Sequence, residues 1–106
     1  MKLPQNGDRY EWTNHVKGKM LRYRISESLI KRIIRSPQRV QEGVAEKTVA
    51  VMQPCGNKKH EAWVMYKTIG KKLRIISAWR YPGQSPKGVP IAIPADALEA
   101  LNLNQS

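Results

Sequence analysis

The chain has 106 residues, 41% of them apolar, with 19 lysines and arginines against eight acidic residues and a net charge of +11. This length suits one domain, and the apolar content is too high for a disordered chain. A single cysteine excludes an internal disulfide framework and fits a reducing compartment. The sequence shows neither a secretory signal nor an apolar stretch of about 20 residues. We therefore expect a cytoplasmic protein whose partner is not a membrane.

The positive charge is concentrated in one part of the chain. Residues 9–80 hold 17 lysines and arginines and five acidic residues, whereas residues 81–106 hold Lys87 against Asp96 and Glu99. A strong excess of positive charge attracts polyanions, of which nucleic acid is the commonest. The charge therefore predicts RNA or another nucleic acid as the partner of residues 9–80.

This basic region begins with a predicted strand and a predicted helix. Polar and aromatic residues alternate over residues 9–12, which is typical of a short strand. Thr13 or Asn14 can cap a following helix, because either side chain accepts a hydrogen bond from a first-turn amide. The apolar stripe of that helix contains Val16, Met20 and Tyr23, and a neighbouring stripe contains His15, Lys19 and Arg22.

A second helix is predicted to start after Ser26 and to end at Ser36, because the residue before Pro37 resists helical geometry. Its apolar face consists of Leu29, Ile30, Ile33 and Ile34. Strands follow at residues 39–41, 48–52, 62–66 and 73–80. This order predicts an α+β domain in which two N-terminal helices pack on one face of a mostly antiparallel sheet of four to five strands.

The last predicted strand, residues 73–80, is the longest and most apolar, which places it at or near the centre of the sheet. Strict alternation puts Arg74, Ile76, Ala78 and Arg80 on one face and Leu73, Ile75, Ser77 and Trp79 on the other. If the two helices cover one face, the face that carries the two arginines is left to solvent and forms a phosphate-binding surface.

Residues 81–106 differ in composition from the preceding region. Prolines recur every fourth residue from Pro82 to Pro94, which favours an extended segment, and residues 96–101 predict a short helix. We therefore divide the chain into a basic α+β domain at 9–80 and a Pro-rich extension with a short C-terminal helix at 81–106.

Metal or cofactor chemistry finds little support in the sequence. Cys55, His15 and His60 are too few for a structural zinc site, and neither a Gly-rich phosphate loop nor a close pair of carboxylates is present. We therefore expect no metal and no cofactor. The remaining side chains suit cleavage of RNA by its own 2′-hydroxyl, which needs a base, an acid and cations around the phosphate.

For that reaction His15 is the best general acid or base, because the pKa of an imidazole is close to neutrality. Lys19, Arg74 and Arg80 would hold and neutralise the phosphate. Either Tyr66 or Tyr23 could stack on a base.

Several short motifs resemble an uncharacterised prokaryotic domain family related to the RelE/ParE and BrnT toxins. They are Trp12-Thr13-Asn14-His15, Lys19-Met20, Arg24-Ile25-Ser26 and Ile33-Ile34-Arg35-Ser36-Pro37. The resemblance covers residues 9–80 and implies the barnase–EndoU–colicin–RelE nuclease fold. His15 and Met20 match the family pattern, and Ser77 is similar to its last-strand threonine. Lys19 and Tyr23 stand where the pattern has arginines, and the neighbouring Arg22 and Arg24 could take over the second position.

Three functions follow as hypotheses. The first is a metal-independent endoribonuclease toxin with His15, Lys19 and Arg80 as catalytic residues, paired with an antitoxin protein. The second is a non-catalytic nucleic-acid-binding module that uses the same basic face. The third is a protein-interaction domain whose sheet edge or Pro-rich tail binds a partner, including a second copy of the chain as a homodimer.

Overall fold

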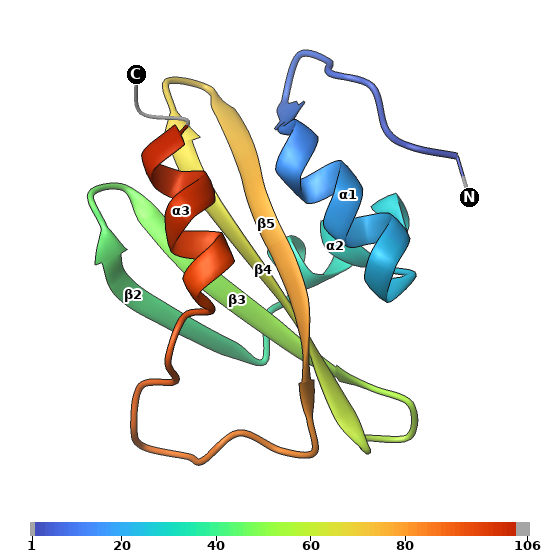
Figure 1. The fold of residues 1–106 in the computed structure, drawn as a ribbon, viewed down its shortest axis with the longest axis vertical. Helices are drawn as coiled ribbons and strands as arrows, with labels where there is room; N and C mark the ends of the chain where they lie inside the picture. Colours follow the sequence, from blue (N-terminus) through green and yellow to red (C-terminus); the bar gives the residue numbers. More distant parts are fainter. Residues whose placement is uncertain (1, 104–106) are drawn as a thin grey trace.

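The computed structural model describes residues 2–103, which form three helices and one sheet (Figure 1). In chain order the elements are β1 (Tyr10–Trp12), α1 (Asn14–Tyr23), α2 (Glu27–Arg35), β2 (Arg39–Ala45), β3 (Thr48–Cys55), β4 (His60–Ile69), β5 (Lys72–Pro82) and α3 (Ala95–Leu103). The predicted helices and strands are all present, and β2 to β5 are longer than the sequence pattern indicated. Among these helices none is long and apolar enough to cross a membrane.

The sheet has the strand order β1-β5-β4-β3-β2. Strands β2 to β5 pair antiparallel as a meander, whereas β1 pairs parallel with β5 over Tyr10–Trp12. The α+β class is therefore confirmed, with a sheet that is mixed because of β1. Strand β4 is central and β5 lies beside it, which agrees with the predicted place of the last strand near the centre.

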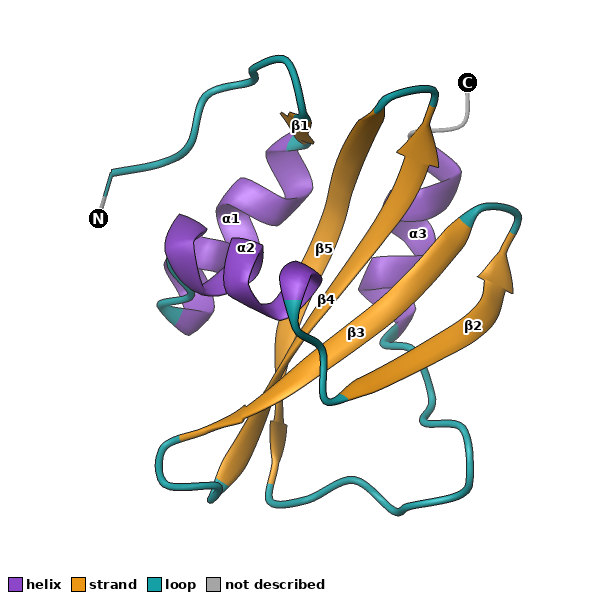
Figure 2. Cartoon of the chain, turned by 180° about the vertical axis from the view of Figure 1, so that it is seen from behind, coloured by secondary structure: helices purple, strands orange, loops and turns teal. Residues whose placement is uncertain are grey.

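Helices cover both faces of the sheet (Figure 2). On the first face α1 and α2 bury a core that includes Val16, Met20, Ile30 and Ile33. On the second face α3 buries Ala97, Ala100 and Leu101 against Trp63, Met65, Ile76 and Trp79. The expectation that the second face is open to solvent is therefore wrong, because the apolar side of α3 covers it.

The strict alternation expected along β5 is also wrong. Ile75 and Ala78 belong to the core of the first face, whereas Ile76 and Trp79 belong to the core of the second. The cause is a shift in the register between β4 and β5. Met65 of β4 pairs with Ser77, but the next residue, Tyr66, pairs with Ile75, so Ile76 has no partner residue in β4. Ile76 is thus an extra residue in β5, and the residues after it change face relative to a regular strand.

The Pro-rich segment between β5 and α3 is fastened to the second face. The Gln41 side chain donates to the Ile91 carbonyl at 2.9 Å and accepts from the Ile91 amide at 2.8 Å. Arg39 donates to the Ser85 hydroxyl at 2.7 Å and to the Val89 carbonyl. Residues 83–94 therefore run from the end of β5 across to β2, and α3 then returns over the sheet (Figure 1).

We predict that α3 stabilises the whole molecule through its buried side. Leu101 is 5% exposed and Leu98, on the same helix, is 41% exposed. Leu101→Ala is expected to lower the free energy of unfolding by about 2–4 kcal/mol because it leaves a cavity in the second core. Leu98→Ala, the matched control, is expected to cost less than about 1 kcal/mol. Urea denaturation measures both values, and equal costs would mean that α3 is not part of the core.

Candidate functional site

Three of the predicted site residues meet in a groove between α1 and α3, beside the edge of β5. His15, Lys19 and Arg22 line it from α1, and Asp96 and Glu99 line it from α3. The groove has a volume of about 540 Å³. The two acidic residues are not among the predicted site residues, although both lie in the short helix predicted at residues 96–101. Their place in the groove follows from the packing of α3, which local sequence patterns do not contain.

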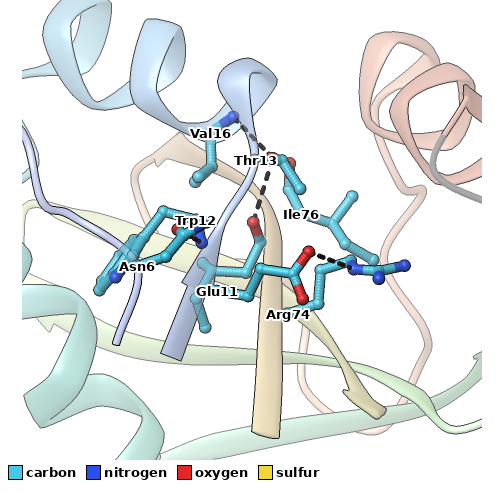
Figure 3. A network of polar contacts seen from close by, with 8 residues as sticks. Asn6, Glu11, Trp12, Thr13, Val16, Arg74 and Ile76 are labelled. Atoms are coloured by element: carbon cyan, nitrogen blue, oxygen red, sulfur yellow. Dashed lines mark hydrogen bonds and ion pairs between the residues drawn. The ribbon is translucent and has the colours of Figure 1, made fainter. Parts of the chain in front are cut away.

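The start of α1 is held against β5 by Thr13 (Figure 3). The Thr13 hydroxyl lies 3.1 Å from each of the carbonyl oxygens of Ile75 and Ile76, and it accepts a hydrogen bond from the Val16 amide. Of the two residues that the sequence offered as the cap, Thr13 and Asn14, Thr13 is the one that caps the helix. Because His15 lies two residues further on, these contacts bring its Nε2 to 3.0 Å from Ser77 Oγ.

The charges in the groove balance one another. Lys19 forms an ion pair with Asp96, and this contact holds the pKa of the Asp96 carboxyl below its usual range. Partial burial lowers the pKa of His15 from its ordinary 6.5, and Lys19 lowers it further, while Asp96 and Glu99 oppose the shift. With two cations facing two carboxylates and a neutral imidazole, the groove offers no excess of positive charge to a phosphate.

Arg80, Tyr23 and Arg24 meet elsewhere, at the C-terminal end of α1. Arg80 donates from Nε to the Tyr23 carbonyl at 2.9 Å and from Nη2 to the Arg24 carbonyl at 3.3 Å. Its Nη1 lies 3.0 Å from the Cys55 sulfur. The guanidinium thus satisfies carbonyl groups that the helix end leaves without intrahelical partners. Tyr23 is eight positions after His15 in α1, which corresponds to a rise of about 12 Å along the helix.

Arg74 and Tyr66 lie away from both groups. Arg74 donates to Glu11 at 3.2 Å near the start of β5 (Figure 3), and it points to the second face because its neighbours Leu73 and Ile75 pack in the first core. Tyr66 is half-buried against the first core. Burial raises the pKa of its hydroxyl, and Tyr10 adds to the shift. The prediction that Arg74 and Arg80 share one face is therefore wrong, since the extra residue Ile76 lies between them.

Five cations belong to segments that end near the β3–β4 turn, and we call this part of the molecule the cationic end. It consists of Arg24, Arg32, Lys58, Lys59 and Arg80. Four of these residues are exposed and Arg80 is half-buried. They come from the end of α1, the last turn of α2, the β3–β4 turn and the end of β5. None of them belongs to the ion pairs formed among residues 2–103, which join Lys19 to Asp96, Lys31 to Glu27 and Arg74 to Glu11.

Specific contacts bring the parts of the cationic end together. Arg32 Nε donates to the Gln53 side chain at 3.1 Å, which ties the last turn of α2 to the end of β3. The Gly83 amide donates to the Lys59 carbonyl at 3.1 Å, which ties the β3–β4 turn to the end of β5. The turn itself begins at Gly56, where φ is +60° and an added Cβ would lie 2.4 Å from the His60 ring. The adjacent lysines Lys58 and Lys59 are the sequence feature that points to this turn, but they are not among the predicted site residues.

No protein-family model matches the chain, and comparisons with the curated proteins and with the solved structures found no significant match. Within residues 2–103, no group of three or more His, Cys, Asp and Glu side chains is arranged to hold a metal ion.

The groove gives a testable prediction about His15. We expect its imidazole to titrate below 6.5, because burial disfavours the charged form. Asp96→Asn should lower this pKa further, because it removes a carboxylate that favours the imidazolium. NMR titration of the ring protons in the wild type, Asp96→Asn and His15→Gln measures and assigns the shift. A higher pKa in Asp96→Asn would contradict the placement of the carboxylate beside His15.

Proposed function

We propose that this protein is a nucleic-acid-binding domain and that the cationic end is its contact surface for RNA. The observation that carries the proposal is that contacts bring together the ends of the elements that carry these five cations. Arg32 binds Gln53 near the end of β3, Arg80 contacts the end of α1 and Cys55, and the Lys59 carbonyl binds the Gly83 amide after β5. Glu61 follows the β3–β4 turn in sequence but is 4% exposed, so its carboxylate lies below the surface and is not one of the exposed groups of the cationic end. Such a surface favours binding to phosphates without regard to sequence.

The two kinds of cation suit different parts of that contact. Lys58 and Lys59 lie in an exposed turn, where mobile ammonium groups can follow an irregular phosphate backbone. Arg24 and Arg32 lie on firmly packed helix ends, and a guanidinium can bind a phosphate through two parallel hydrogen bonds. Arg80 donates hydrogen bonds to two carbonyl groups at the end of α1, so it supplies positive charge and positions Arg24.

RNA is the preferred ligand because the resemblance to the toxin-related family implies it, and a cytoplasmic site of action suits the same ligand. The RelE-like fold itself is part of this proposal, since two helices, α1 and α2, precede the meander and pack on one of its faces.

Cleavage of RNA is a second candidate function, favoured by the contact between His15 and Ser77 and by the lowered pKa of His15. A neutral imidazole at physiological pH can accept a proton from a 2′-hydroxyl. Against this candidate, Lys19 is paired with Asp96, and Arg80 lies at the other end of α1. An antitoxin partner belongs to this second candidate alone.

The binding proposal is tested by two lysine pairs at opposite ends of the sheet. Lys58→Gln/Lys59→Gln changes the β3–β4 turn, and Lys71→Gln/Lys72→Gln makes the same charge change about 30 Å away, at the other end of β4. We expect the first double variant to bind a single-stranded RNA about tenfold more weakly. The slope of log K against log salt should also fall by about two.

The second double variant is the control and should stay within about twofold of the wild type. Fluorescence anisotropy over a range of salt concentrations measures affinity and slope together. Equal losses in the two variants would show attraction by overall charge only, and no loss in either would overturn the proposal. Single- and double-stranded DNA in the same assay test the preference for RNA.

The binding proposal also predicts that RNA stays intact. Incubation of the purified protein with RNA in EDTA should leave the RNA at full length, as judged by gel electrophoresis. Cleavage that His15→Gln abolishes and Asn14→Ala retains would replace simple binding with the endoribonuclease function. Asn14 is an exposed neighbour in the same groove, so its variant controls for disturbance of the start of α1.

A further inference from the structure

A second hollow, with a volume of about 420 Å³, adjoins the cationic end on the second face of the sheet. The end of β3 and the start of β4 form its floor, and residues 84–88 of the Pro-rich segment form one wall. Its lining combines a buried carboxylate with several cations and amides: Glu61, Arg39, Lys58, Lys87, Gln38 and Gln84. The volume falls within the range of ordinary small-molecule sites.

Glu61 is the unusual residue of this hollow. It is 4% exposed, and its Oε1 accepts a hydrogen bond from Trp63 Nε1 at 3.1 Å. Buried carboxylates are normally paired with a cation. Within residues 2–103, however, no lysine, arginine or histidine forms an ion pair with Glu61. The carboxylate is therefore held in place at the lining of the hollow, where a ligand that carries N–H groups can bind to it.

Three cations line the same hollow as that carboxylate. Arg39 is fixed by Ser85 and Val89, and its guanidinium carbon lies 5.8 Å from the centre of the Trp63 ring. Lys58 and Lys87 are exposed on two different segments, the β3–β4 turn and the Pro-rich wall. With three cations against one carboxylate, the hollow favours a ligand that carries net negative charge together with hydrogen-bond donors.

We propose that this hollow binds one nucleotide of the RNA, with its phosphate among Arg39, Lys58 and Lys87 and the amino group of its base on Glu61. The inference rests on the proposed function, because Lys58 belongs both to the cationic end and to the hollow. A nucleotide supplies both chemical groups at once. A bare phosphate supplies only the anion, and the carboxylate of Glu61 repels it.

The test uses free nucleotides as probes. Isothermal titration calorimetry compares AMP, GMP and CMP, whose bases carry an amino group, with UMP, ribose 5-phosphate and inorganic phosphate. We expect the three amino-bearing nucleotides to bind about tenfold more tightly than UMP. Ribose 5-phosphate and inorganic phosphate should bind no more tightly than UMP. Equal affinities for all six probes would overturn the proposal.

Two variants separate this role from a structural one. Glu61→Gln keeps an oxygen for the Trp63 N–H but removes the charge, so the preference for amino-bearing bases should fall to about twofold. Its affinity for UMP should not fall, because a repulsive charge has gone. Glu42→Gln makes the same change on an exposed residue of β2 and should retain the tenfold preference. Loss of binding to all probes in Glu61→Gln, with an unchanged melting temperature, would contradict the assigned role.

A variant of Lys87 tests the hollow separately from the cationic end, because Lys87 lines the hollow and does not belong to the cationic end. Lys87→Gln should weaken all the nucleotides about threefold or more and leave the salt slope of a long RNA within one unit of the wild type. If RNA binds through the β3–β4 turn but no nucleotide binds, the pocket proposal fails and the proposed function stands. If Lys87→Gln weakens nucleotides while Lys58→Gln/Lys59→Gln leaves RNA affinity unchanged, the proposed function fails and nucleotide binding stands.

Discussion

Helix α1 is fastened to strand β5 at both of its ends, and this double attachment determines where the candidate residues lie. At the first end Thr13 contacts the carbonyl groups of Ile75 and Ile76, and at the second Arg80 binds the carbonyl groups of Tyr23 and Arg24. The helix therefore cannot slide or rotate without losing buried hydrogen bonds. One consequence is that His15 faces Ser77, and the other is that Arg80 is held away from His15.

The local features of the fold could be predicted from the sequence, because each depends on residues a few positions apart. Thr13 and Ser26 cap their helices as expected, and α2 ends at Arg35, just before the Ser36-Pro37 pair. The extra residue Ile76 could not be predicted, since a register shift depends on the partner strand β4. Because of this extra residue, Arg74 and Arg80 lie on different faces of the sheet. The expected phosphate-binding surface, which needs both arginines on one face, is therefore not formed. The sequence therefore predicted correctly that His15, Lys19 and Arg22 lie together. It did not predict where the two arginines of β5 lie.

The separation of charge along the chain does not persist in space. Residues 81–106 are nearly neutral, yet α3 places Asp96 beside Lys19 and Glu99 in the same groove, so a weakly acidic tail cancels the charge of the most conspicuous basic stripe. The cations around the β3–β4 turn, in contrast, form none of the ion pairs found among residues 2–103. A net charge identifies a class of partner, whereas its location on the surface depends on which cations the carboxylates neutralise.

The Pro-rich segment shapes both the hollow beside Glu61 and the groove beside His15, because contacts with β2 fix its path. Gln41 and Arg39 hold it across the second face, which brings Lys87 to the hollow beside Glu61 and delivers α3 to the groove beside His15. Exposed lysines and arginines alone would attract any polyanion, since Coulombic attraction to phosphate carries no sequence information. A buried carboxylate among those cations adds a requirement that only some ligands meet, because it favours hydrogen-bond donors and repels bare phosphate. In the proposed binding of RNA, affinity and selectivity therefore arise from neighbouring parts of the same end of the molecule, with Lys58 common to both.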